Sequence, residues 1–213
     1  MSEFTYGNLI RFENKTLLLK YLSAGTPYIQ LNDEWLAFFT EEDGEQRSSD
    51  FVKKLSEHCP ILYFYNLEDH FWGFEILHQG DLMSSCHFSY DLESELLFDI
   101  ARDRFPDKGE IAGFLFNSKE GQDAYEQIQA ELRDPVVFER EVRKHFETVC
   151  ADDFQLFGIN EESIDELHQL LSADTYLNRE FDAIDRFKNV LNLNEMSWIR
   201  FERTEDRDNV EYV

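Results

Sequence analysis

The sequence has no run of about 20 apolar residues, the length that a helix needs to cross a bilayer. Its first residues, Met1 to Thr5, also lack the basic start and the apolar stretch of a secretory signal. We therefore expect a cytoplasmic protein that does not enter a membrane.

Cysteine is scarce, and the three residues Cys59, Cys86 and Cys150 include no C-x-x-C pair. An odd number of thiols in a chain of this size argues against a disulfide framework. The pairs His58-Cys59 and Cys86-His87 could in principle hold zinc, but they lack the usual gap of two residues, and neighbours on a strand point to opposite faces. We expect free, mostly buried thiols and surface imidazoles, with no metal and no cofactor.

Common catalytic motifs are missing as well. The sequence has no P-loop, no G-x-G-x-x-G, no G-x-S-x-G and no H-E-x-x-H. These absences favour a protein that is not an enzyme, and no catalytic residue is assigned. The alternative is a metal-assisted enzyme, whose carboxylates and histidines would come together only in the tertiary structure.

Positive charge is the scarcest property of all. Lys and Arg number 20 against 45 Asp and Glu, which gives a formal net charge of −25. Two long tracts, from Lys54 to Arg102 and from Lys144 to Arg179, contain no cation between their ends. Nucleic acids and anionic membranes are bound through cationic side chains, so we expect neither as a direct partner. A basic protein is the expected partner.

What the chain does have is apolar material for a core. Hydrophobic residues make up 42% of the 213 residues, and 20 of them are Phe, which excludes a disordered chain. This length suits one large domain or two small ones. A boundary near Asp107 to Gly109 would separate a sheet-rich half, 1–106, from a mostly helical half, 107–213, although one continuous domain is the alternative.

The first half predicts short helices and antiparallel strands. The patterns indicate helices at 14–22 and from Ser48 or Ser49 to Leu55, a hairpin of 28–31 with 35–39, and a meander of three strands over about 61–90. In the meander we expect Trp72, Phe74 and Ile76 to share one buried face, and Leu82, Cys86, Phe88 and Tyr90 another.

The second half predicts mainly helices. They are expected from about Asp91 to Phe105, at 118–132, from Asp134-Pro135 to about Cys150, after Asn160, and around 181–191. A weak strand is predicted at 111–116, and an alternating segment at 197–203 predicts a final strand that returns to the sheet or pairs with 210–213. The expected class is α+β.

Candidate contact residues come from the acidic tracts and loops. They are Glu41, Glu42 and Asp43 in one loop, Glu68 and Asp69 with Trp72 at a hairpin tip, and the pairs Asp152-Asp153 and Glu161-Glu162. The bland alternatives are a solvated acidic surface that serves only solubility or a high-salt habitat, and a Trp72 that points inward. The leading hypothesis is a binding protein for a basic partner: an inhibitor, an immunity factor or a nucleic-acid mimic.

Overall fold

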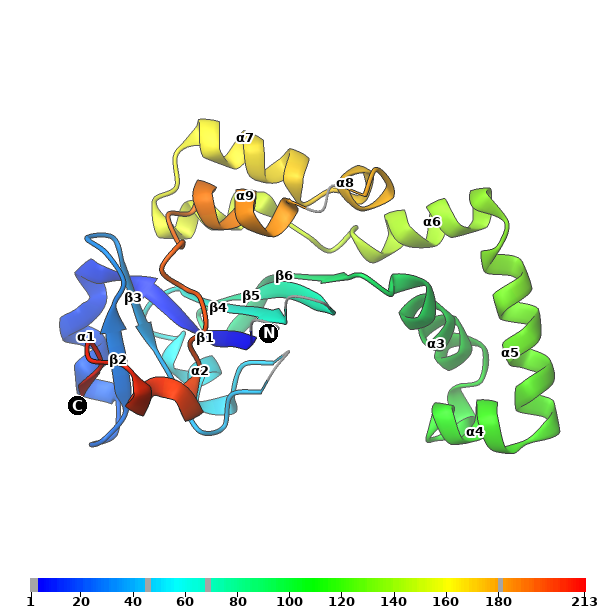
Figure 1. Ribbon diagram of the computed structural model, residues 1–213, viewed down its shortest axis with the longest axis horizontal. Coiled ribbons are helices and arrows are strands. Elements are labelled where there is room, and N and C mark those ends of the chain that lie inside the picture. Colours follow the sequence, from blue (N-terminus) through cyan, green and yellow to red (C-terminus); the bar gives the residue numbers. More distant parts are fainter. Residues whose placement is uncertain (1–3, 45–46, 68–69, 180–181) are drawn as a thin grey trace. The chain divides into compact units, whose positions relative to one another are not determined.

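The computed structural model describes residues 4–44, 47–67, 70–179 and 182–213, and it confirms the α+β class (Figure 1). The strands are β1 (Phe4–Arg11), β2 (Pro27–Gln30), β3 (Trp35–Phe38), β4 (Ile61–Leu67), β5 (Phe71–His78), β6 (Asp81–Ser89) and β7 (Glu211–Tyr212). The α-helices are α1 (Lys15–Tyr21), α2 (Asp50–Leu55), α3 (Leu92–Arg104), α4 (Ile111–Asn117), α5 (Lys119–Leu132), α6 (Pro135–His145), α7 (Glu161–Leu170), α8 (Ala173–Leu177) and α9 (Ala183–Val190). Short 3-10 helices are η1 (Phe12–Asn14), η2 (Pro106–Lys108), η3 (Ala151–Phe157) and η4 (Phe201–Asp206).

The strands form one sheet of seven, in the order β6-β5-β4-β1-β3-β2-β7. The predicted hairpin (β2 and β3) and the predicted meander (β4, β5 and β6) are both confirmed. β1 was not predicted. It pairs antiparallel with β3 on one side and with β4 on the other, so it joins the hairpin and the meander into a single sheet.

Gly7 and Asn8 obscure the strand pattern of β1, although Tyr6, Leu9 and Ile10 are good strand formers. Gly7 is needed for packing. A Cβ atom at this position would lie 2.5 Å from Cε1 of Phe39 and 3.0 Å from Cε of Met196. The strand therefore gives up a side chain where two buried apolar groups approach its backbone.

One face of the sheet is covered by α1 and α2. The side chains of Leu18 from α1, and of Val52 and Leu55 from α2, are buried against strand residues that share one face. The cluster consists of Tyr6, Ile10, Leu18, Leu22, Tyr28, Leu36, Phe38, Val52, Leu55, Cys59, Ile61, Tyr63, Tyr65 and Leu77. Ser49 begins α2 as predicted, because its hydroxyl accepts a hydrogen bond from the backbone N–H of Val52.

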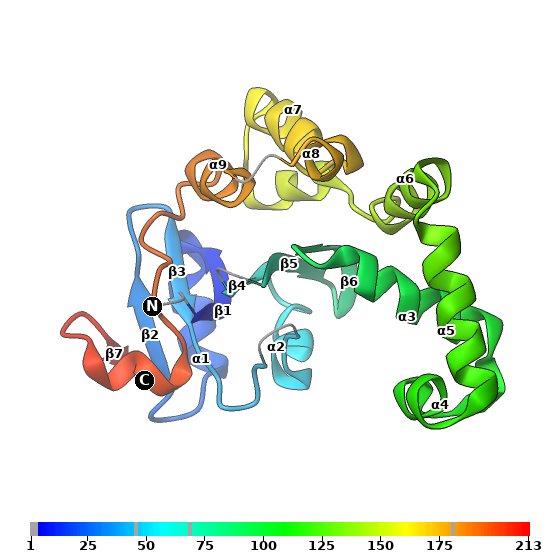
Figure 2. The same ribbon diagram turned by 45° about the vertical axis from the view of Figure 1, so that its right-hand side comes forward.

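The opposite face is covered by η3 and by α9, which runs beside α7 (Figures 1 and 2). Phe187 of α9 stacks on Phe64 and Phe74 with ring centroids 5.9 and 5.5 Å apart. Phe154 of η3 meets the edge of Phe74 at 5.0 Å. The inner strands β1, β3 and β4 are therefore buried on both faces, with aromatic side chains in the cores on either side.

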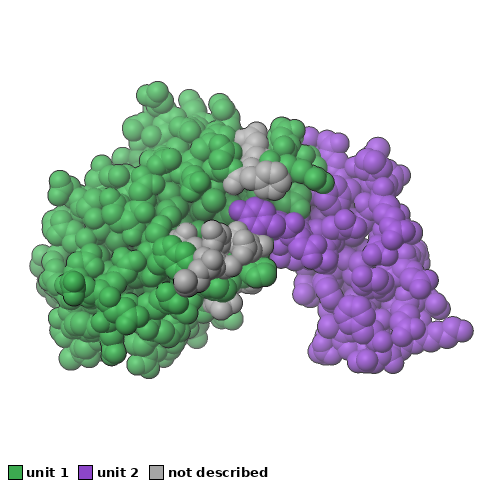
Figure 3. Space-filling model, viewed as in Figure 1, with its two compact units in different colours: residues 1–88, 148–213 green, residues 89–147 purple. Residues whose placement is uncertain are grey.

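The contacts divide the chain into two compact units, residues 1–88 with 148–213 and residues 89–147, coloured separately in Figure 3. The first unit contains nearly all of the sheet, and the second contains α3 to α6. Compactness does not show independent folding, so the division into 1–106 and 107–213 stays a prediction.

Most predicted helices are confirmed, but 111–116 is not a strand. This segment forms α4, whose first turn is capped by the carboxylate of Glu110, which accepts a hydrogen bond from the N–H of Gly113 at 2.8 Å. Ile111 and Leu115 lie one helical turn apart and are both buried. The apolar residues of this run follow the helical period, and the strand prediction was wrong. The helix predicted to start at Asp134-Pro135 is confirmed as α6, but it ends at His145 and not near Cys150.

The predicted final strand is confirmed, but it lies later in the chain than 197–203. Residues 197–203 form no strand, and η4 takes their place from Phe201 onward. The final strand is β7, which pairs antiparallel with β2 at the edge of the sheet.

The predicted buried face of β6 is wrong at Leu82, which is 50% exposed, whereas Cys86 and Phe88 are buried. Among the described residues, no helix combines the length and the apolar character of a membrane span.

The close packing at Gly7 predicts that Gly7→Ala lowers the free energy of unfolding by about 1–3 kcal/mol, because the new methyl group must displace the ring of Phe39. Urea denaturation measures this change. Gly44→Ala is the matched control, since the nearest atom to its new Cβ lies 3.8 Å away. Equal stability of the two variants would contradict the packing that we describe.

Candidate protein-binding surfaces

The largest of the predicted acidic sites lies on η3 and α7. Asn160 starts α7, because its side-chain oxygen accepts a hydrogen bond from the N–H of Ser163 at 3.0 Å. The apolar positions of α7 (Ile164, Leu167 and Leu170) then turn inward, which leaves the acidic positions outside. The η3–α7 acidic surface comprises Asp152, Asp153, Glu161, Glu162, Asp165 and Glu166, all exposed except the half-buried Asp153.

Few cations oppose this surface. The imidazole Nε2 of His168 lies 3.0 Å from Oδ1 of Asp152, and Nε of Arg186 lies 3.9 Å from Oε1 of Glu166. Within the described residues, Glu161, Glu162 and Asp165 have no cation at ion-pair distance. Glu161 and Glu162 also favour helix formation, because they occupy the first turn, where the helix dipole is positive. Asp165 and Glu166 were not among the predicted contact residues, although the cation-free tract contains them.

The loop between β3 and α2 separates its three predicted acids. Asp43 turns inward and is buried: its carboxylate accepts hydrogen bonds from Nδ2 of Asn8 at 2.5 Å and from the N–H groups of Thr40 and Ser49 at 3.1 Å each. Glu41 and Glu42 stay exposed. Asp43 therefore holds the loop in shape, and only its two neighbours face solvent.

Two further contacts fix this loop to the sheet. The hydroxyl and the N–H of Ser48 both donate to Oε2 of Glu75 on β5, at 2.5 and 3.1 Å. The Tyr63 hydroxyl donates to the carbonyl of Gly44. Burial raises the pKa of Tyr63 above its ordinary value, and the carboxylate of Asp43 raises it further, so this phenol remains a hydrogen-bond donor.

The predicted hairpin tip does not present its tryptophan to a partner. Trp72 is fully buried, with ring centroids 5.3 Å from Phe88 and 5.2 Å from Phe187, which agrees with the alternative that it points inward. Glu68 and Asp69 lie outside the described residues, so their predicted contact with a partner stays a prediction.

A groove of about 370 Å³ lies beside Glu41 and Glu42. Two of its lining residues, Phe51 and Phe201, are half-buried aromatic residues. The complete lining is Ser23, Ala24, Gly25, Thr26, Phe39, Thr40, Glu41, Glu42, Phe51 and Phe201. We call it the Glu41–Phe201 groove. Sequence patterns did not point to Phe51 or Phe201, because the two residues are 150 positions apart in the chain.

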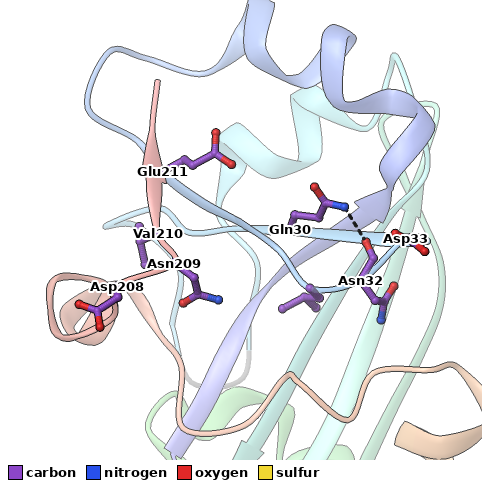
Figure 4. Close-up of a pocket in the computed structure, with 8 residues that line it drawn as sticks. Gln30, Asn32, Asp33, Asp208, Asn209, Val210 and Glu211 are labelled. Atoms are coloured by element: carbon purple, nitrogen blue, oxygen red, sulfur yellow. Dashed lines mark hydrogen bonds between the residues drawn. The ribbon is translucent and has the colours of Figure 1, made fainter.

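A second pocket, of about 440 Å³, lies between the β2–β3 turn and the residues that lead into β7 (Figure 4). Its polar groups are largely used within the fold. The side chain of Gln30 donates to the carbonyl of Asn32 at 3.3 Å, and Glu211 accepts from the Tyr28 hydroxyl at 2.7 Å. Figure 4 shows Asp33 and Glu211 at opposite ends, so these carboxylates do not converge on one point.

Histidines and cysteines do not gather into a site in the described parts of the chain, where no three His, Cys, Asp or Glu side chains are placed to hold a metal ion. His58 stacks on Tyr21 at 4.2 Å, and His87 bonds through Nδ1 with the Tyr65 hydroxyl at 2.9 Å. Cys59 and Cys86 are buried as predicted. Burial raises the pKa of Cys59 to about 11 and that of Cys86 to about 12.

Comparisons with family models, with curated proteins and with solved structures find no match for this chain.

The hydrogen bonds of Asp43 predict that Asp43→Asn lowers the free energy of unfolding by about 1–3 kcal/mol, because an amide nitrogen replaces one of the accepting oxygens in a buried site. Urea denaturation at pH 7 tests this expectation. Glu42→Gln makes the same chemical change on an exposed neighbour and should leave stability within about 0.5 kcal/mol of the original. If Glu42→Gln lowers the free energy of unfolding as much as Asp43→Asn does, the loss comes from the removed charge and not from the hydrogen bonds of Asp43.

Thiol burial predicts selective alkylation. Thiolate is the reactive form, and a raised pKa leaves Cys59 and Cys86 with about one thiolate in a thousand or fewer at pH 8. Cys150 is half-buried and should react first with iodoacetamide, followed by the other two only in denaturant. Peptide mass spectrometry identifies the modified residues. Rapid labelling of Cys86 in the native protein would contradict its buried position.

Proposed function

We propose that this protein is a non-enzymatic acidic binding protein that engages a basic protein partner, in the manner of an inhibitor, an immunity factor or a nucleic-acid mimic. The observation that carries the proposal is the η3–α7 acidic surface, where exposed carboxylates stand with few opposing cations. Direct contact with nucleic acid or with anionic lipid is not part of the proposal, because like charges repel.

The physical basis is long-range attraction. A surface that carries one sign of charge attracts an oppositely charged partner before contact, and such steering raises association rates by about 10 to 1,000 fold at low salt. The net charge of −25 supplies the general attraction, and the η3–α7 surface supplies a direction for it.

The surface is also rigid enough to be specific. The buried side chains of Leu167 and Leu170 hold α7 in place, and Phe154 and Phe157 hold η3 through the aromatic core. Carboxylates that project from packed helices lose less conformational freedom on binding than carboxylates on a loose tail. This arrangement favours one partner over nonspecific attraction of many cations.

A pull-down from the native host at low salt, followed by measurement of the dissociation constant of the purified partner against salt concentration, tests the proposal. The variant Glu161→Gln/Glu162→Gln/Asp165→Asn should weaken binding about tenfold, since each of three surface charge pairs contributes up to about 1 kcal/mol. Its salt dependence should also be shallower, because fewer charges remain to be screened.

The matched control is Asp107→Asn/Asp123→Asn/Glu126→Gln, which removes the same net charge from exposed positions of the second unit. It should change the affinity less than about threefold, because only the general attraction weakens. Binding that salt does not affect, or the recovery of no basic protein, would refute the proposal. Equal losses in both variants would refute the role of the η3–α7 surface.

A further inference from the structure

We propose that the Glu41–Phe201 groove binds an arginine side chain of the basic partner. This inference rests on the proposed function for the source of the arginine, but its chemistry can be tested with a peptide alone. The groove offers what a guanidinium needs: carboxylates at its edge and aromatic rings in its wall.

The groove is built by three regions of the chain: residues 23–26, the β3–α2 loop with the start of α2, and η4. The β3–α2 loop brings Glu41 and Glu42, the start of α2 brings Phe51, and η4 brings Phe201. The remaining side, Ser23–Thr26, is tied to the end of the chain, since the N–H of Gly25 donates to the carbonyl of Val213 at 2.9 Å and the N–H of Val213 donates to Thr26 at 3.1 Å. Backbone hydrogen bonds within the chain therefore hold this side of the groove in place.

The charge at the groove is uncompensated. Glu41 and Glu42 are exposed, and among the described residues no Lys or Arg lies at ion-pair distance from either. The next residue, Asp43, is used up by its inward hydrogen bonds. Two carboxylates thus remain for a cation, which selects a positively charged occupant.

The aromatic walls select arginine among the cations. Phe51, which also packs against the core cluster, and the half-buried Phe201 both belong to the lining, so they are the aromatic residues available to a bound cation. A guanidinium is planar and weakly hydrated, so it stacks on a ring while its N–H groups pair with carboxylates, whereas the compact lysine ammonium holds its water more strongly. A volume of about 370 Å³ is at the small end for ligand pockets and suits one long side chain.

The test titrates the isotope-labelled full chain with the capped pentapeptide acetyl-Gly-Ser-Arg-Ser-Gly-amide and follows backbone amide shifts by NMR. We expect saturable shifts at Gly25, Thr26 and Glu41–Glu42 with a dissociation constant on the order of 1 mM, as befits a single side chain. The same peptide with citrulline, which is neutral and of nearly the same shape, should bind at least about tenfold more weakly, and the lysine peptide about threefold more weakly.

Two variants test the two halves of the groove. Glu41→Gln/Glu42→Gln should lower the affinity for the arginine peptide about tenfold, and Phe201→Leu, which keeps an apolar wall but removes the ring, about threefold. Asp123→Asn/Glu126→Gln is the control for lost net charge and should bind as the original does. Urea midpoints confirm that each variant is folded.

The outcomes separate this inference from the proposed function. Shifts spread evenly over the surface, equal binding of the citrulline or lysine peptide, or no loss in Glu41→Gln/Glu42→Gln would each overturn the arginine site, even if a basic partner is captured. If the pull-down captures no basic protein, the proposed function is overturned. Specific binding of the arginine peptide would then still support the arginine site in the groove.

Discussion

The pairing of β1 with β3 and β4 is the constraint on which the first unit depends. β1 is the only strand that links the β2–β3 hairpin to the β4–β5–β6 meander among the described residues. Both of its edges are paired, and the side chains on both of its faces are buried or half-buried. The helices α1 and α2 bury one face, while η3 and α9 bury the other, and the acidic segments are positioned as a consequence of this burial.

Burial also explains how so acidic a chain arranges its charge. Asp43 is retained inside because a side-chain amide and two backbone N–H groups offset the cost of removing its carboxylate from water. Glu41 and Glu42 of the loop and the acids of α7 stay outside, where water and salt moderate their mutual repulsion. Neighbouring acids of one loop thus differ in role: Asp43 shapes the fold, whereas Glu41 and Glu42 face solvent.

The proposed function and the proposed groove draw on different parts of this arrangement. In these proposals the η3–α7 surface would act at a distance through its charge, whereas the Glu41–Phe201 groove would act at contact through its shape, its aromatic residues and two carboxylates. The two effects would complement each other, because long-range attraction raises the association rate and local contacts lower the dissociation rate. Both belong to the first unit, so neither depends on how residues 89–147 are placed.

The sequence by itself determined the α+β class, the hairpin, the meander, most helix starts and the net charge, because these follow from local periodicity, capping residues and composition. It did not reveal β1, because Gly7 makes room for the distant Phe39 and Asn8 donates a hydrogen bond to the distant Asp43. It also did not reveal α4, because its short apolar run fits the period of a strand as well as that of a helix. Which acids face solvent was likewise decided only by tertiary structure: Asp43 and Glu42 are neighbours in the chain, but only the first meets buried donors. The groove is the clearest case, since Phe51 and Phe201 become neighbours only when the chain end folds back along the edge of the sheet.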